Sequence, residues 1–154
     1  VTSVWSVLND QLETLWVDGG GTVNLVWTDH DKWHKPVQIS PAGYFSPGAQ
    51  LSGIYQPFAH ELMVFGIDSR GVLKMMWKKD NGKWQTSADM SPPGYAVPGG
   101  AVSAVFAPRT NALELAGSST AGARSAGAAG SPGGGAMTSR SPFSVRSTFG
   151  KSAA

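Results

Sequence analysis

A repeat of about 50 residues limits what this chain can fold into more than any other feature of its sequence. Identical aromatic residues recur 50 or 51 positions apart, and the pairs are Trp27 with Trp77, Trp33 with Trp84, and Tyr44 with Tyr95. A Ser-Pro-x-Gly-Tyr motif ends at each of these tyrosines. Because residues 1–12 also align with residues 102–113, the segment 1–116 holds two whole repeats and the beginning of a third.

Each repeat predicts four short β-strands and no helix. In the second repeat we expect strands over about 50–56, 61–68, 72–78 and 83–88. Glycine-containing turns separate the middle strands, at Ser69-Arg70-Gly71 and Asp80-Asn81-Gly82. Four short strands per repeat, with periodic glycine and aromatic residues, are typical of a β-propeller blade. The predicted fold class is therefore all-β, with four-stranded antiparallel repeats.

The number of repeats predicts an incomplete ring. Propellers usually close with about 4–8 blades. Two blades and part of a third would leave apolar sheet faces and strand edges uncovered. We therefore expect either a fragment of a longer protein or a homo-oligomer that completes the propeller.

The segment 117–154 has a different composition from the repeats. Gly, Ala and Ser make up 25 of its 38 residues. Such a segment buries too little apolar surface to offset its ordering entropy, which predicts a disordered tail after a folded body at 1–116. Two origins fit this composition, a natural linker and a shifted reading frame in a GC-rich gene.

The charge distribution argues against a nucleic-acid surface on the repeats. The net charge of the chain is +2, but residues 1–116 carry −2 and the segment 117–154 carries +4. The chain has no cysteine, which excludes disulfides and thiolate zinc sites. The sequence contains no run of about 18 apolar residues, so it predicts no membrane-spanning helix.

The repeated positions resemble the bacterial and fungal fucose-binding propeller lectin superfamily. In the second repeat the matching positions are Leu62, Phe65, Asp68, Gly71, Leu73, Trp77 and Trp84, and in the first they are Leu12, Leu15, Asp18, Gly21, Val23, Trp27 and Trp33. The resemblance implies a secreted or extracellular, non-enzymatic lectin that binds fucosylated or O-methylated glycans in shallow pockets between blades. The Arg and Glu pair that grips fucose in the best-known fungal members has no counterpart in both repeats, which leaves the sugar open.

Aromatic side chains are the candidate ligand contacts, because an indole or phenol face matches the C–H face of a sugar ring. The candidates are Trp33, Trp84, Tyr44, Tyr95, Trp27 and Trp77. The alternative for Trp27 and Trp77 is packing between neighbouring sheets, and for Tyr44 and Tyr95 it is a cap over a sheet edge.

Other polar groups favour structural interpretations. We expect Asp18 and Asp68 to form Asx turns rather than to bind calcium or a sugar hydroxyl. The unrepeated histidines, His30, His34 and His60, do not indicate a metal site. A cluster of lysines around one hairpin is interpreted as a solvated face, and its members are Lys74, Lys78, Lys79 and Lys83.

No enzyme constellation and no cofactor motif is present in the sequence. Two other functions stay open beside the lectin. One is a structural or protein-interaction propeller, and the other is an accessory fragment of a secreted glycoside hydrolase.

Overall fold

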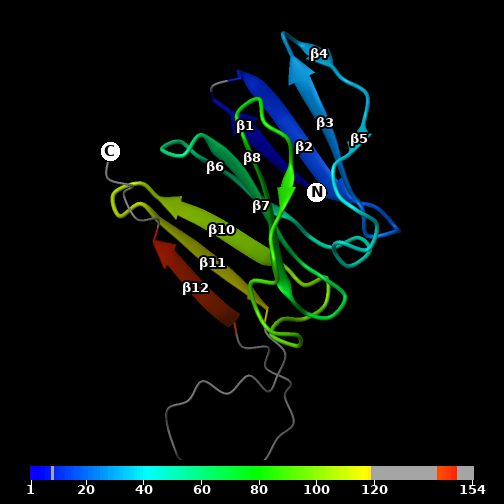
Figure 1. Ribbon diagram of the computed structural model, residues 1–154, viewed down its shortest axis with the longest axis vertical. Coiled ribbons are helices and arrows are strands. Elements are labelled where there is room, and N and C mark those ends of the chain that lie inside the picture. The colour runs from blue at the N-terminus through cyan, green and yellow to red at the C-terminus, as the bar shows by residue number, and fades with distance from the viewer. Residues whose placement is uncertain (8, 119–141, 149–154) are drawn as a thin grey trace, which may run out of the picture.

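The computed structural model describes residues 1–7, 9–118 and 142–148, which form three antiparallel β-sheets (Figure 1). The first sheet contains β1 (Thr2–Ser6), β2 (Gln11–Val17), β3 (Val23–Asp29), β4 (Lys32–Trp33) and β5 (Val37–Gln38). The second contains β6 (Ser52–Gln56), β7 (Glu61–Ile67), β8 (Leu73–Lys79) and β9 (Gln85–Thr86). The third contains β10 (Val102–Ala107), β11 (Ala112–Ser118) and β12 (Pro142–Thr148). The all-β prediction is confirmed for the described residues, which contain no helix and no closed sheet.

The order of strands within each sheet follows the repeat. The second sheet has the order β6-β7-β8-β9, and the first has β1-β2-β3-β4 with β5 also paired to β3. The outermost strands are only two residues long. In the second sheet the reason is local, because Ser87 Oγ accepts a hydrogen bond from the Met75 N–H at 3.0 Å and so replaces a backbone carbonyl where pairing ends.

The repeated aspartates build the hairpin turns, as the sequence indicates. Asp18 Oδ1 accepts hydrogen bonds from the backbone N–H groups of Gly20 and Thr22, at 2.8 and 3.0 Å. Asp68 Oδ1 does the same for the second sheet. Gly71 has φ = 73°, and a Cβ there would lie 2.3 Å from the Ala96 carbonyl oxygen, so both its φ and the close backbone approach favour glycine.

The Ser-Pro-x-Gly-Tyr motif recurs because it ties each long connection to its own hairpin. Ser40 Oγ accepts a hydrogen bond from Val23 N–H at 2.8 Å, and Ser91 Oγ accepts one from Leu73 N–H at 3.0 Å. These serines therefore satisfy the first amide of β3 and of β8, which explains their conservation between the two repeats of this chain.

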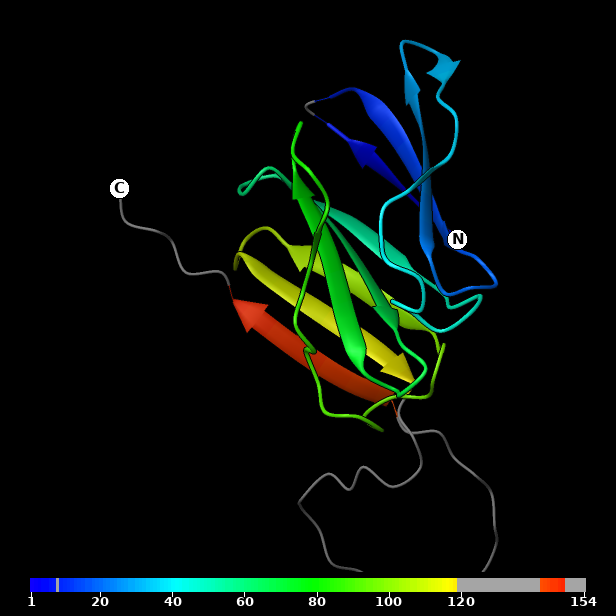
Figure 2. The ribbon, with the colours of Figure 1, turned by 45° about the vertical axis from the view of Figure 1, so that its right-hand side comes forward.

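The second sheet lies between the other two and is covered on both faces (Figures 1 and 2). One face of β7 contributes Leu62 and Val64 to a first core shared with the first sheet. The other face contributes Met63, Phe65 and Ile67 to a second core shared with the third sheet. The expected common face of Leu73, Met75 and Trp77 is confirmed, since all three pack in the second core.

Strand β12 corrects part of the expected disordered tail. Seven residues, Pro142–Thr148, pair antiparallel with β11 from Ala112 to Ser118. The signal was present in the sequence, because Phe143, Val145 and Phe149 alternate with polar residues, the period of a strand. The prediction of a disordered tail used the composition of the whole segment, which is poor in bulky residues, and so it missed this short alternation. Gly117 and Ser118 of the predicted tail complete β11, and the rest, 119–141 and 149–154, lies outside the described residues.

Candidate ligand-binding site at the first sheet junction

The junction between the first and second sheets contains a buried charged pair that sequence reasoning missed. Glu13 lies on β2 and is fully buried. Its carboxylate oxygen Oε1 is 2.8 Å from Lys78 Nζ, which comes from β8 of the second sheet. Apart from this ion pair, the described residues offer neither carboxylate oxygen a hydrogen-bond partner. Burial of a charged carboxylate costs folding free energy unless an opposite charge compensates it, so the Glu13 carboxylate depends on Lys78 to stay buried.

Aromatic rings surround this pair from both sheets. Trp84 packs against the first core, and Lys78 Nζ lies 5.6 Å from the centroid of its ring. Trp27 is the β3 residue directly opposite Glu13 in the strand register. The Trp27 ring stacks on the imidazole of His34, with centroids 4.6 Å apart and planes 6° from parallel. We call Glu13, Trp27, His34, Lys78 and Trp84 the junction cluster.

The junction cluster combines the two kinds of group that recognise a small polar ligand with apolar faces. Lys78 is 14% exposed in its side chain and carries three donor protons, of which Glu13 needs one. Trp27 and Trp84 are each partly buried, so part of their ring surface is accessible. Lys78 can therefore donate hydrogen bonds to a ligand oxygen while a neighbouring indole contacts C–H groups.

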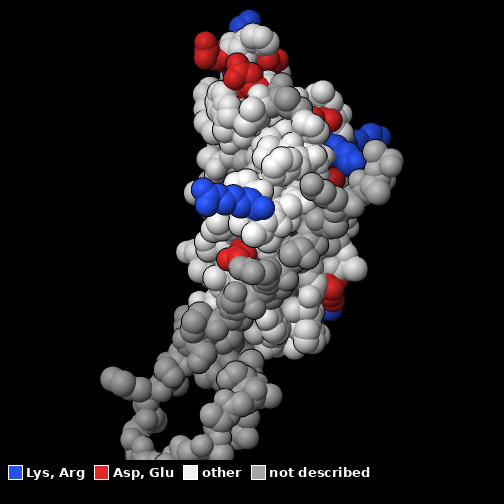
Figure 3. Space-filling model, turned by 90° about the vertical axis from the view of Figure 1, so that its left-hand side faces the viewer, with Lys and Arg blue, Asp and Glu red and all other residues white. Residues whose placement is uncertain are grey.

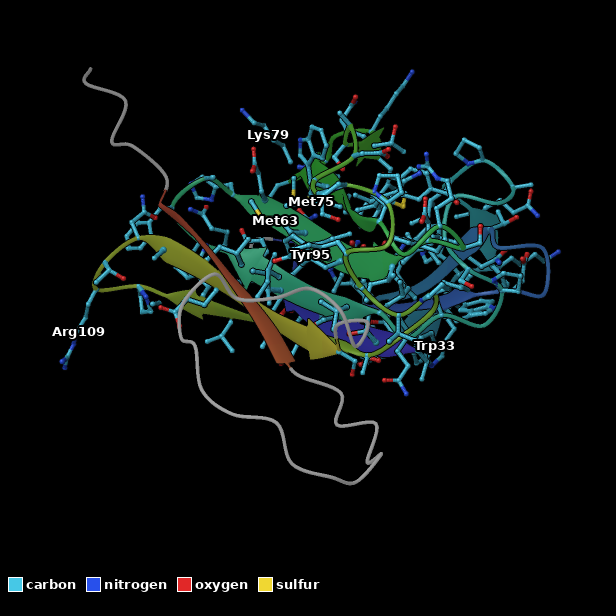
Figure 4. The ribbon with its side chains drawn as sticks, turned by 90° about the horizontal axis from the view of Figure 1, so that it is seen from below. Trp33, Met63, Met75, Lys79, Tyr95 and Arg109 are labelled. Atoms are coloured by element: carbon cyan, nitrogen blue, oxygen red, sulfur yellow. The ribbon has the colours of Figure 1, made fainter. Side chains whose placement is uncertain are left out.

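The equivalent place at the junction of the second and third sheets is apolar. Met63 stands where the first repeat has Glu13, and it is paired in register with Trp77. Both pack in the second core together with Tyr95. Figure 4 shows Met63, Met75 and Tyr95 close to one another on the second sheet and its following loop, with Trp33 in a different part of the molecule. The two junctions thus share a geometry and differ in chemistry.

The structure separates the six candidate contacts into three environments. Trp27 and Trp84 belong to the first junction, and Trp77 and Tyr95 pack against the second core. Tyr44 is buried, and its hydroxyl donates a hydrogen bond to the Met75 carbonyl oxygen at 2.8 Å, so it bridges two sheets. Burial also raises the pKa of Tyr44. Trp33 is 59% exposed on the short strand β4.

The interpretation of four lysines as a solvated face is wrong for two of them. The side chains of Lys74 and Lys78 are only 14% exposed. Lys74 Nζ lies 3.4 Å from Asp68 Oδ2 and 4.8 Å from the centroid of the Tyr44 ring. The two-residue period of a strand could have predicted this burial. Lys74, Met76 and Lys78 alternate along β8, so they lie on the same face, which is the one that packs against the first sheet.

The face drawn in Figure 3 is mostly uncharged, with a few acidic side chains gathered at its upper end and the other charged side chains scattered. Within the described part of the chain, no group of three or more His, Cys, Asp or Glu residues could hold a metal ion. None of the described segments is a helix long and apolar enough to cross a membrane.

Comparison with solved structures links this architecture to a lectin. No protein-family model and no curated protein matches the chain. The chain is similar to the BP39L lectin from Burkholderia pseudomallei, with 31% sequence identity and a TM-score of 0.63 over 70% of this chain. A second solved structure, an N-acetylgalactosamine deacetylase from F. plautii in complex with blood group B trisaccharide, is 16% identical over 79% of this chain and 41% of that chain. Its TM-score of 0.48 is too low to bear on fold or function.

The chain spans about a third of the lectin's length, since the match covers 31% of that protein. The resemblance to lectins that the repeated positions predict is confirmed by this neighbour. Over most of its length, the chain is therefore similar in sequence and in fold to a bacterial lectin.

Proposed function

We propose that this chain is a non-enzymatic carbohydrate-binding protein whose sheets are blades of a β-propeller and whose ligand site is the junction cluster. The observation that carries the proposal is the Glu13–Lys78 ion pair between two sheets, with Trp84 beside the ammonium and Trp27 opposite the carboxylate. The similarity to a bacterial lectin supports the ligand class.

The cluster favours a sugar for a chemical reason. A pyranose presents hydroxyl oxygens at its edge and C–H groups on its face, so it needs fixed donors beside an aromatic plane. Lys78 is a fixed donor because Glu13 anchors it from the buried side. The resemblance to the superfamily makes fucosylated and O-methylated sugars the first to test.

Binding at one junction is expected to be weak alone and to be strengthened by several sites on one surface. Linking sites raises the effective concentration for the second contact without any new contact at each site. The second junction has Met63 in place of the acid, so we assign the described polar site to the first junction only.

The test is binding of the full chain to a glycan array, followed by calorimetric titration with methyl glycosides of fucose and of O-methylated sugars. The matched variant is Glu13→Met with Lys78→Met, which gives the first junction the apolar chemistry of the second. We expect the wild type to bind and the double variant to lose binding while it keeps its β-sheet circular dichroism spectrum. Undiminished binding by the folded double variant would place the ligand elsewhere, and a folded wild type that binds no glycan would refute the function.

A further inference from the structure

A carboxylate of the second sheet lies on the same face as Lys78, two residues further along the chain. Strand β8 ends at Lys79, but the backbone N–H of Asp80 donates a hydrogen bond to the His60 carbonyl oxygen at 3.0 Å, so the pairing continues for one more residue. Side chains two residues apart on a paired strand lie on the same face of the sheet. Because Lys78 reaches Glu13 of the first sheet, Asp80 also lies on the side of the junction cluster.

The side chain of Asp80 is held by a tyrosine from the same face of the second sheet. Tyr55 packs against the first core, and its hydroxyl donates a hydrogen bond to Asp80 Oδ2 at 3.0 Å. Burial raises the pKa of Tyr55, and the hydrogen bond to the Asp80 carboxylate raises it further, so the hydroxyl keeps its proton and stays a donor. The Asp80 side chain is only 13% exposed. The acid is therefore fixed in position at the edge of the junction.

The tyrosine hydroxyl occurs in one repeat only. Trp5 and Phe106 stand at the positions equivalent to Tyr55 in the first and third repeats, and neither side chain has a hydroxyl. Packing of an aromatic ring at this position does not require the hydroxyl, so its contribution is the hydrogen bond to Asp80. The positioned acid thus occurs on the same sheet as Lys78, the donor of the junction cluster.

Lys78 and Asp80 carry opposite charges on one face but are held by different partners. Lys78 Nζ pairs with Glu13, and Asp80 Oδ2 accepts from Tyr55. His60 Nδ1 lies 3.6 Å from the same oxygen, so the described contacts of the Asp80 side chain all use Oδ2. A carboxylate accepts hydrogen bonds through both of its oxygens. Oδ1 can therefore accept from a ligand hydroxyl, beside an ammonium that can donate to one.

We propose that Asp80 is the hydroxyl acceptor of the junction site and that the ligand is a sugar with two adjacent free hydroxyl groups. One hydroxyl accepts a hydrogen bond from Lys78 Nζ, and its neighbour on the ring donates one to Asp80 Oδ1. Tyr55 is a positioning residue, because it acts through the acid. The inference rests on the proposed carbohydrate binding and adds a requirement to it. A sugar methylated at the oxygen that faces Asp80 has no proton to donate, and it binds more weakly.

The test compares Asp80→Asn with the wild type as full chains, by calorimetric titration with the methyl glycoside that binds the wild type most tightly. In Asp80→Asn the one carbonyl oxygen stays bonded to Tyr55, and the amide group can only donate. We expect the affinity to fall at least about tenfold, since a hydrogen bond to a charged group is lost. The matched control is Glu61→Gln, which changes a carboxylate on the opposite face of the same sheet and should leave the affinity unchanged.

Monodeoxy derivatives of the same glycoside separate ligand contact from a structural effect. In the wild type, removal of either of two adjacent hydroxyls should weaken binding. In Asp80→Asn, one of these two removals should cost no further affinity, which a structural role of Asp80 would not produce. Tyr55→Phe should lower the cost of the same removal, because it frees the acid to move. This variant carries the comparison if Asp80→Asn does not fold.

The outcomes distinguish this inference from the proposed function. A folded Asp80→Asn that binds the glycoside as tightly as the wild type overturns the inference, while loss of binding in Glu13→Met with Lys78→Met would still support the junction site. Equal losses for the glycoside and all of its deoxy derivatives overturn the inference as well, because they indicate a structural effect. A folded wild type that binds no glycan refutes both.

Discussion

The first and second sheets come from the same repeat, yet they differ in how much of each sheet is buried. Strand β7 is buried at six of its seven positions, while the equivalent strand β2 alternates between buried and half-buried residues. Trp84 packs against a core, but the aligned Trp33 is 59% exposed. The second sheet has a neighbour on both faces among the described residues, and the first has one, so the neighbour rather than the repeat sets the burial.

The largest expected effect tests the difference between the two junctions. Lys78→Met should lower the free energy of unfolding by about 3–5 kcal/mol, because it leaves the buried Glu13 carboxylate without its partner. Adding Glu13→Met should restore most of that loss, since the second junction is stable with Met63 at this position. Urea denaturation of both variants measures the effect.

The reciprocal change, a carboxylate placed in the apolar second junction, should lower the free energy of unfolding for the same reason. Met63→Glu buries a carboxylate where no lysine is opposite in the described residues, and it should cost a similar free energy. Equal stability of Met63→Glu and the wild type would show that the second junction admits water and that the two junctions are less different than we infer.

An intermediate effect compares the aligned tryptophans. Trp84→Ala removes a ring that packs in the first core and covers Lys78, and we expect a loss of about 2–3 kcal/mol in unfolding free energy. Trp33→Ala should stay within about 0.5 kcal/mol, the range for exposed residues. Differential scanning calorimetry of the two variants side by side makes the measurement. Equal losses would mean that Trp33 is covered in solution and would contradict the difference between the two sheets.

A smaller effect follows from exchanging one residue between equivalent positions. Val64 is fully buried in β7 and Thr14 occupies the same place in β2, where its hydroxyl bonds to Ser3 Oγ at the surface. Val64→Thr should cost about 1–3 kcal/mol, because it buries a hydroxyl. Thr14→Val should change unfolding free energy by no more than about 0.5 kcal/mol. Chemical denaturation of both variants measures these losses. A larger loss in Thr14→Val than in Val64→Thr would contradict the comparison.

The smallest expected effect concerns the repeated turn aspartates at low pH. Hydrogen bonds from Thr22 N–H and the Asn24 amide lower the pKa of Asp18. Burial pushes the pKa of Asp68 upward, but hydrogen bonds from the Val72 and Arg70 N–H groups and the Arg70 charge outweigh it, so this pKa also lies below the ordinary 3.8. Each carboxylate therefore stabilises the folded state above about pH 3.8, and this contribution is lost as the pH falls from there through the lowered pKa.

The two turns should differ in salt sensitivity during that acid transition. Asp68 also lies within 4 Å of the Arg70 and Lys74 side chains, whereas Asp18 is bonded by uncharged groups. Unfolding monitored by circular dichroism between pH 5 and about pH 2 should show a smaller acid-induced loss in Asp68→Asn than in the wild type, with the difference reduced by salt. Asp18→Asn should show a loss that salt changes less.

Much of the local structure could be predicted from particular residues. The 50-residue spacing predicts the sheets, and Asp18 and Asp68 form the turns that their types indicate. The expected strand at 61–68 is observed as Glu61–Ile67, because alternation and flanking turns are local properties of the chain. Strand β12 was missed because its alternation covers only a few residues within a segment rich in Gly, Ala and Ser.

The candidate site could be predicted only in part. Trp84 and Trp27 were found by their recurrence, but the second repeat has Met63 in place of Glu13, the first has Thr28 in place of Lys78, and the two charged residues lie 65 positions apart. Nothing local predicts that their charges meet, since the contact exists only when two sheets stack. In the same way, Tyr44 looks like a loop residue in sequence, and its hydroxyl reaches Met75 of the next sheet.

The sequence by itself determined the period, the strands, the turns and the aromatic positions of this protein, because these depend on residues near one another in the chain. Only the tertiary structure decided which copy of each repeated residue is buried, which junction is charged and which faces are exposed. The physical reason is that burial and charge pairing depend on what lies about 10 Å across a sheet interface, and that neighbour comes from a different repeat.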